Sequence, residues 1–168
     1  MRLSSKLESG IRAAILVLLA SGLAAIPAAA ATATNSLSVS ATVQASCTVT
    51  ASAMSFGNYT GSTATATSAV SVTCTNATPY NVGLSAGTAS GATVSTRKMT
   101  GPASALLSYS LFSDPSRTIN WGQTAGSDTV TGIGSGAVQA LTVYGQTPAG
   151  QFLTPGSYTD TVTATITY

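Results

Sequence analysis

The sequence has 168 residues, contains no histidine and has very few charged residues. Asp, Glu, Lys and Arg together make up 6% of it, against about 25% in an ordinary soluble domain. Without histidine there can be no Ser-His or Cys-His catalytic pair and no imidazole metal ligand. The few carboxylates suit paired-carboxylate chemistry poorly. An enzyme is therefore the least expected class, and we expect no cofactor or metal.

The few charges are unevenly distributed along the chain. Arg2, Lys6, Glu8 and Arg12 lie in the first twelve residues. The remainder carries three basic and three acidic residues: Arg97, Lys98, Arg117, Asp114, Asp128 and Asp160. The formal charge of +2 therefore belongs to the N-terminal segment, and the rest of the chain is neutral. No basic cluster exists to neutralise phosphates, so nucleic acid is not an expected partner.

Residues 1–30 have the pattern of a secretory signal peptide. A positive start is followed by an apolar run over residues 13–26, then by Pro27 and three alanines that resemble a cleavage site. The run is short for a bilayer span, which needs about 20 residues. We therefore predict export and no membrane span after cleavage; an uncleaved anchor is the alternative.

Export changes the interpretation of the two cysteines, Cys47 and Cys74. In a secreted chain an isolated pair indicates one disulfide. Two thiols without histidine cannot complete a tetrahedral metal shell. We predict a structural Cys47–Cys74 bridge.

Threonine and alternating apolar residues predict strands. After residue 30 the chain contains 28 Thr and 20 Ser, and Thr suits a pleated surface. Glycine, asparagine, aspartate and proline separate the alternating runs, as expected of turns. Seven or eight short strands in one all-β sandwich are predicted, with residues 61–67 as a mobile low-complexity loop. The clearest runs are residues 37–43, 70–74, 80–84, 105–112, 137–144 and 162–168.

The first and last of these runs carry the functional clue. Leu37, Val39, Ala41 and Val43 share one face of the N-terminal run, and Val162, Ala164, Ile166 and Tyr168 share one face of the C-terminal run. Uncharged edge strands invite pairing with another chain. The pattern leaves two possibilities open: the two runs pair within one molecule, or the N-terminal strand completes the next subunit.

The chain resembles the spore coat protein U domain family, which includes subunits of archaic chaperone–usher pili. The order and spacing of several blocks carry this resemblance. It covers residues 47–49, 54–59, 70–74, 80–87, 97–99, 107–114, Arg117, 121–122, 143–145 and 155–162. One departure is Gln146, where the family pattern has Arg after Tyr144-Gly145.

The resemblance implies an incomplete immunoglobulin-like β-sandwich that is completed by a donor strand. In such families a periplasmic chaperone lends a strand, and an outer-membrane usher replaces it with the N-terminal extension of the next subunit. It implies a donor extension over residues 31–45 with Leu37, Val39, Ala41 and Val43 as its inserted side chains, and a sandwich over residues 46–168. Val162, Ala164, Ile166 and Tyr168 would border the acceptor groove, and the Cys47–Cys74 bridge would stiffen the body. The product would be a cell-surface fimbrium.

Two other functions fit the sequence less well. One is a self-contained coat or matrix protein of the same fold that does not polymerise. The other is a carbohydrate-binding adhesin that uses Asp114, Arg117 and Trp121, residues that are also explained as a turn, a nearby ion pair and a core or rim aromatic. Asp128 and Asp160 are expected to be isolated and to face solvent or cap turns.

Overall fold

The computed structural model describes residues 29–168, so most of the predicted signal peptide lies outside the described residues. The chain divides into two units, Met1–Ser40 and Ala41–Tyr168. Residues 29–46 contain no regular secondary structure, and their side chains are exposed. The strand expected over residues 37–43 is thus absent from the single chain; a strand needs a partner for its backbone hydrogen bonds.

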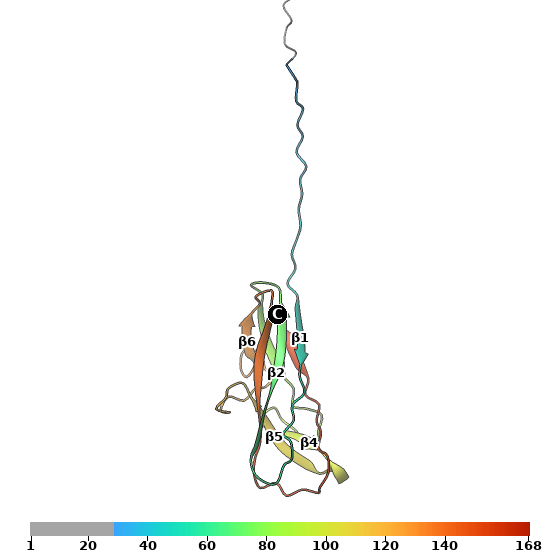
Figure 1. The fold of residues 1–168 in the computed structure, drawn as a ribbon, viewed down its shortest axis with the longest axis vertical. Helices are drawn as coiled ribbons and strands as arrows, with labels where there is room; N and C mark the ends of the chain where they lie inside the picture. Colours follow the sequence, from blue (N-terminus) through green and yellow to red (C-terminus); the bar gives the residue numbers. More distant parts are fainter. Residues whose placement is uncertain (1–28) are drawn as a thin grey trace, which may run out of the picture. The chain divides into compact units, whose positions relative to one another are not determined.

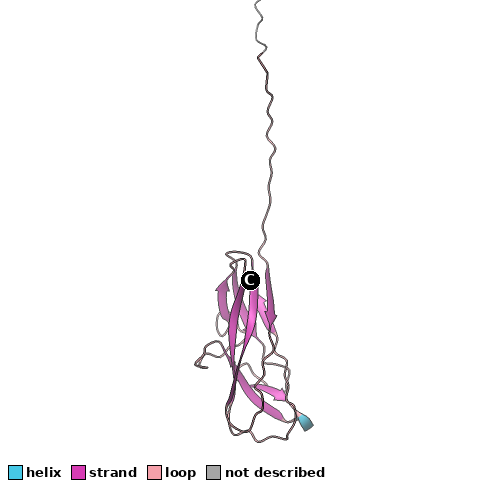
Figure 2. Ribbon diagram, in the orientation of Figure 1, coloured by secondary structure: helices cyan, strands magenta, loops and turns pink. Residues whose placement is uncertain are grey.

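The unit Ala41–Tyr168 is an all-β sandwich (Figures 1 and 2). A 3-10 turn, Pro102–Ser104, lies between the fourth and fifth strands. The strands are β1 Cys47–Ala51, β2 Ala64–Cys74, β3 Pro79–Leu84, β4 Arg97–Thr100, β5 Leu106–Phe112, β6 Val130–Ile133, β7 Val138–Thr147 and β8 Ala164–Thr167.

The strands form two antiparallel sheets. The larger sheet has the order β1-β2-β7-β5-β4, and the smaller has the order β6-β3-β8. The longest ladder joins β2 to β7, from the pair Ala64 and Thr147 to the pair Thr73 and Val138. Strands β1 and β8 each lie at an edge of a sheet, and they approach each other between the two sheets.

Alternation along the strands places the core where the sequence pattern predicts it. In β2, Val70, Val72 and Cys74 are buried, while the residues between them are half-buried on the opposite face. Because strand side chains alternate between the faces, the inward residues of both sheets meet in one apolar layer. The core cluster is Val70, Val72, Cys74, Tyr80, Val82, Leu84, Tyr109, Leu111, Trp121 and Val143.

Two expectations about element boundaries were wrong. Strand β2 begins at Ala64, so much of the predicted loop over residues 61–67 is a strand paired with β7. The C-terminal strand is shorter than its alternating pattern, because only Ala164–Thr167 pairs with β3. In both cases the partner strand, rather than the local sequence, determines where pairing starts.

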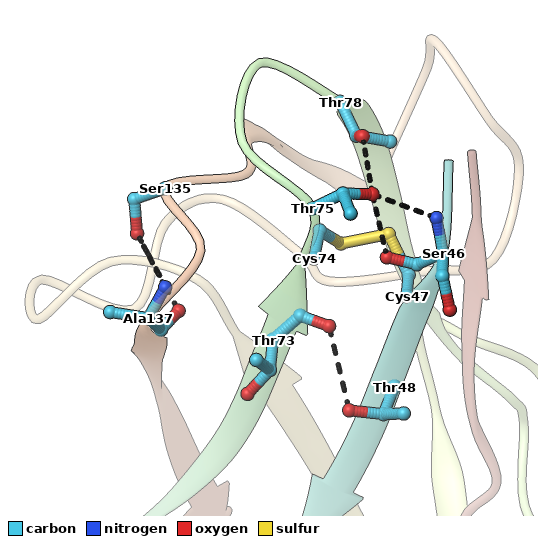
Figure 3. Close-up of a disulfide and its surroundings, with 9 residues drawn as sticks. All are labelled: Ser46, Cys47, Thr48, Thr73, Cys74, Thr75, Thr78, Ser135 and Ala137. Carbon is cyan, nitrogen blue, oxygen red and sulfur yellow. Dashed lines mark hydrogen bonds between the residues drawn. A yellow bond between two sulfur atoms is a disulfide. The ribbon is translucent and has the colours of Figure 1, made fainter. Parts of the chain in front are cut away.

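The predicted disulfide joins Cys47 to Cys74 (Figure 3). The two residues are directly opposite each other in the β1–β2 ladder, with a Cα–Cα distance of 4.1 Å. Beside them the backbone N–H of Ser46 donates to Thr75 Oγ1 at 2.8 Å, and the N–H of Thr75 donates to the Ser46 carbonyl at 2.9 Å. The Thr75 hydroxyl also donates to the Ser46 carbonyl at 3.2 Å, so the start of β1 is fixed to the end of β2 by one covalent bond and three hydrogen bonds.

Candidate functional site

The sandwich unit contains a groove of about 1220 Å³ with an apolar floor. Its floor comes from inward residues of five strands, and its two walls are residues 51–61, which follow β1, and residues 151–164, which lead into β8. The floor residues are Val70, Leu84, Met99, Leu107, Tyr109, Leu111 and Val143.

Backbone groups along both walls lack strand partners. In the part of the chain that the structure describes, no backbone–backbone hydrogen bond involves residues 53–60 or residues 160–162. Buried backbone groups are nearly always paired, and open strand edges are templates for another strand. The groove thus combines an apolar floor with two free backbone edges, which is what an inserted strand requires.

The first wall rests on the floor through Met54 and Phe56. The Phe56 ring lies 6.0 Å from the Tyr109 ring, measured between centroids. Both side chains reach the backbone of Gly145 in β7, where an added Cβ would contact Met54 Sδ and lie 2.8 Å from Phe56 Cζ. Gly145 therefore provides the space that these two side chains occupy.

Hydrogen bonds join the two walls through the segment 148–151. The Tyr59 hydroxyl donates to the Pro148 carbonyl at 2.6 Å and accepts from the Gln151 N–H at 3.2 Å. The Gly150 N–H donates to the Gly61 carbonyl at 2.9 Å. The Gln151 side chain accepts from the Ser108 N–H at 2.7 Å and donates to the Ser108 carbonyl at 3.0 Å, which ties this segment to β5.

Asp160 is the one carboxylate that lines the groove, among the described residues. It is not isolated, as the sequence suggested, because it accepts hydrogen bonds from Thr88, Thr161 and the Tyr109 hydroxyl. Partial burial alone would raise the pKa of Asp160, but these hydrogen bonds outweigh it and lower the pKa. Burial, followed by the bond to Asp160, raises the pKa of Tyr109.

A buried arginine, Arg97, donates hydrogen bonds to backbone carbonyls next to the groove floor. Arg97 is fully buried, and its guanidinium donates to the carbonyls of Ser85, Val94, Leu84 and Trp121 at 2.6–2.8 Å. Burial lowers the pKa of Arg97. Arg97 lies opposite Tyr109 in the β4–β5 ladder. Its four carbonyl partners come from three separate segments, since Leu84 and Ser85 are neighbours, so one side chain holds these segments together.

The acceptor residues predicted from the sequence are divided between two environments. Val162 and Ala164 line the groove. Ile166 packs against the core cluster, whereas Tyr168 is 58% exposed and does not line the groove. The predicted donor side chains Leu37, Val39 and Val43 are more than 80% exposed, and Ala41 is also exposed.

The sequence prediction missed the floor and the first wall. Their residues come from β2, β3, β4, β5 and β7 and from the segment after β1, so alternation within one strand could not group them. The sequence signal that could have predicted these groove residues was the set of blocks that carry the family resemblance. Residues 54–59, 107–114 and 155–162 supply many of the lining residues.

The position of Trp121 does not support the sugar-binding site that the sequence offered as an alternative. This side chain is 1% exposed, and its Nε1–H donates to the Val82 carbonyl at 2.8 Å. Asp114 accepts from the N–H groups of Thr118 and Ile119 and so caps a turn, while Arg117 donates to the carbonyls of Gly145 and Pro115. The three residues form no exposed binding surface.

Within residues 29–168, no helix is long and apolar enough to cross a membrane. The same residues contain no group of three or more His, Cys, Asp or Glu side chains that could hold a metal ion.

Comparisons with known proteins agree with this architecture. The chain is 37% identical over 159 residues to Protein U of Myxococcus xanthus, a match that covers 84% of this chain and 88% of the relative. The fold is similar to a chain in the crystal structure of the CsuC-CsuE chaperone-tip adhesion subunit pre-assembly complex from archaic chaperone-usher Csu pili of Acinetobacter baumannii, with a TM-score of 0.56 and 25% identity. That match covers 76% of this chain but only 40% of the solved chain. A sequence profile of the Spore Coat Protein U domain matches residues 33–165, and the chain therefore belongs to this family.

Proposed function

We propose that this chain is an exported structural subunit of a surface fibre, and that its copies are joined by donor-strand exchange. The observation that carries the proposal is the apolar groove flanked by two backbone edges without strand partners. Residues 37–43 supply the matching occupant, because alternate apolar side chains are exposed on a segment that has no strand partner of its own. A residue run of this kind from a second copy would pair with the edges and fill the floor.

The partners follow from this mode of assembly. An unfilled apolar groove would aggregate during export, so a periplasmic chaperone would occupy it first and an outer-membrane usher would replace the chaperone with the next subunit. The similarity to a chain in a chaperone–subunit pre-assembly complex supports the chaperone step. The signal peptide over residues 1–30 would provide entry to the periplasm, and the fibre would stand on the cell surface.

The estimated free energies of strand insertion favour a contact between subunits that is stable because it dissociates slowly. Each larger donor side chain gains about 1.5–3 kcal/mol on burial, and Ala41 less. About eight ladder hydrogen bonds would add roughly 1 kcal/mol each, against about 10 kcal/mol or more for ordering ten residues. The net affinity is therefore moderate, and slow release of the strand from a folded groove would give the fibre its durability.

The test is a matched pair of substitutions in the extension. Val43→Asp would place a charge on the apolar floor, which costs several kcal/mol, whereas Thr42→Asp would place the same charge on the opposite face of the strand. Gel electrophoresis without boiling should show a polymer ladder for the unsubstituted chain and for Thr42→Asp, and monomer for Val43→Asp. Deleting residues 35–44 should also abolish the ladder.

The opposite result would identify a self-contained protein of the same fold. A folded, unsubstituted chain that runs as a monomer before boiling would contradict polymerisation. A normal ladder from Val43→Asp or from the deletion would contradict the assignment of the donor strand.

A further inference from the structure

We propose that Asp160 is the positioning residue of the groove: it fixes the spacing between the second wall and the floor, so that residues 160–162 stay free to pair with an incoming strand. This inference rests on the proposed function and adds the residue that sets the shape of the acceptor.

The wall around Asp160 has no ladder to hold it. On one side Thr159 pairs with Thr100, through hydrogen bonds of 2.8 and 3.1 Å. On the other side Ser85 donates its N–H to the Thr163 carbonyl at 3.0 Å and accepts from the Thr163 N–H at 2.9 Å through its hydroxyl. Between these anchors, within the described residues, the backbone of 160–162 is bonded to no other strand. A side chain must therefore fix its position.

The Asp160 carboxylate makes four hydrogen bonds in this gap. Oδ1 accepts from the Thr88 N–H at 2.8 Å, from the Thr88 hydroxyl at 2.9 Å and from the Thr161 N–H at 2.7 Å. Oδ2 accepts from the Tyr109 hydroxyl at 2.7 Å. Each carboxylate oxygen offers about two acceptor sites, so Oδ1 is fully occupied and Oδ2 is engaged by Tyr109. Because both oxygens are bonded within the chain, Asp160 acts through the position of the wall rather than as a ligand of the incoming strand.

The four bonds connect the second wall to the floor and to the loop that follows β3. Tyr109 belongs to the floor and is 5% exposed, so its hydroxyl needs a partner. Thr88 lies in the loop after β3, and the preceding Gly87 has a φ of 88° with its Cα facing the carboxylate; an added Cβ would contact Asp160. The chain therefore leaves room at position 87 for this carboxylate.

Removing the carboxylate would release the wall toward the floor. The Tyr109 hydroxyl would lose its partner, and residues 160–162 would be held only at Thr159 and Thr163. Val162 already packs against the core cluster, and because covering apolar surface is favourable, it would then bury more of its surface against the floor. The groove would narrow in the chain without a donor, and an entering strand would have to reopen it.

The experiment measures strand capture separately from stability. The full chain carrying Val43→Asp keeps its own extension out of the groove, and the probe is a fluorescent peptide with the sequence of residues 35–46. In this background Asp160→Ala should weaken peptide binding at least tenfold and Tyr109→Phe several-fold. Asp160→Asn, whose Oδ1 can still accept from Thr88 and Thr161, should lie between Asp160→Ala and the parent chain. Asp128→Asn, at a turn where Asp128 accepts from the Thr124 N–H, should bind like the parent.

Circular dichroism melting of the same samples gives the second readout. A purely structural role would lower the melting temperature and leave the affinity of the folded fraction unchanged, and that result would overturn the proposal. Native affinity in folded Tyr109→Phe and Asp160→Asn would overturn it too, even if Asp160→Ala does not fold. Failure of the parent chain to bind the peptide would instead contradict the proposed function itself.

Discussion

Removal of the Cys47–Cys74 bridge has a consequence whose size can be worked out from the structure. The bridge spans a sequence separation of 27 residues. Closing a loop of this length lowers the entropy of the unfolded chain by an amount equivalent to roughly 3–4 kcal/mol. Domains of this size are stable by about 5–15 kcal/mol. Cys47→Ala/Cys74→Ala should therefore lose about a fifth or more of the unfolding free energy.

The expected change in melting temperature follows from the size of the sandwich unit, Ala41–Tyr168. With an unfolding entropy of about 2.1 cal/mol/K per residue, a loss of 3–4 kcal/mol lowers the midpoint by roughly 10–15 °C. Thermal and urea unfolding of the double variant, beside the oxidised chain, would measure it. Reduced but unsubstituted protein is the matched control, because it keeps both side chains in the core.

The loss should be concentrated in β1. This strand pairs only with β2, over five residues, and it leads into the first wall of the groove. Without the bridge, Ser46 keeps only its bonds to Thr75 at that end (Figure 3). Hydrogen exchange should become faster in β1 than in β7, and capture of the 35–46 peptide should weaken because one edge of the groove frays.

A double variant that loses less than about 1 kcal/mol would refute the loop-closure argument. Equal exchange rates in β1 of the oxidised and reduced chains would refute the claim that the bridge secures the wall. The two results are independent, so the stability and the groove arguments can fail separately.

Two further predictions concern the floor and the pH dependence. Gly145→Val would displace Met54 and Phe56, so it should destabilise the sandwich unit by about 1–3 kcal/mol in urea unfolding and reduce the polymer ladder. A normal ladder at native stability would contradict the packing of Met54 and Phe56 on Gly145. The folded pKa of Asp160 lies below its ordinary value of 3.8, so its charged form contributes stability that is complete above the unfolded pKa and is lost as the pH falls through the folded pKa. The stability advantage of the native chain over Asp160→Asn should therefore be constant from pH 7 to about pH 5 and shrink below about pH 4. An advantage that grows on acidification would contradict the sign of this pKa shift.

Alternation predicted the fold class and much of the core, because a sheet with one buried face imposes a period of two on its strands. Val70, Val72, Val82, Leu84 and Leu111 are buried as the pattern indicates. Export and an even cysteine count similarly predicted the disulfide that the structure contains. These are local or pairwise signals, which a single sequence carries directly.

The groove floor required information that no single segment holds. Met99, Leu107 and Val143 are neighbours only because β4, β5 and β7 pair in that order, and strand order is a property of the whole sheet. Asp160 illustrates the same limit at one residue. In the sequence it is a lone acid near the C-terminal run; in space it meets Thr88 and Tyr109, 72 and 51 positions away.

The few charged side chains of the sandwich unit lie where they bond to the chain itself. Arg97 is buried among four carbonyls, and Asp114 and Asp128 accept backbone N–H groups at turns. Asp160 holds the groove wall. Each of these four charges is thus occupied with backbone or hydroxyl partners of its own chain. Edge strands usually resist pairing through lysine, proline or an inward charge, yet β1 and β8 carry no charged residue and no proline. Of the two free edges beside the groove, residues 53–60 carry no charge and no proline, and Asp160, the one charge of residues 160–162, is bonded to Thr88, Thr161 and Tyr109. Neither edge therefore presents an unpaired charge against strand addition, and a single aspartate on the inserted face should be enough to create such a barrier.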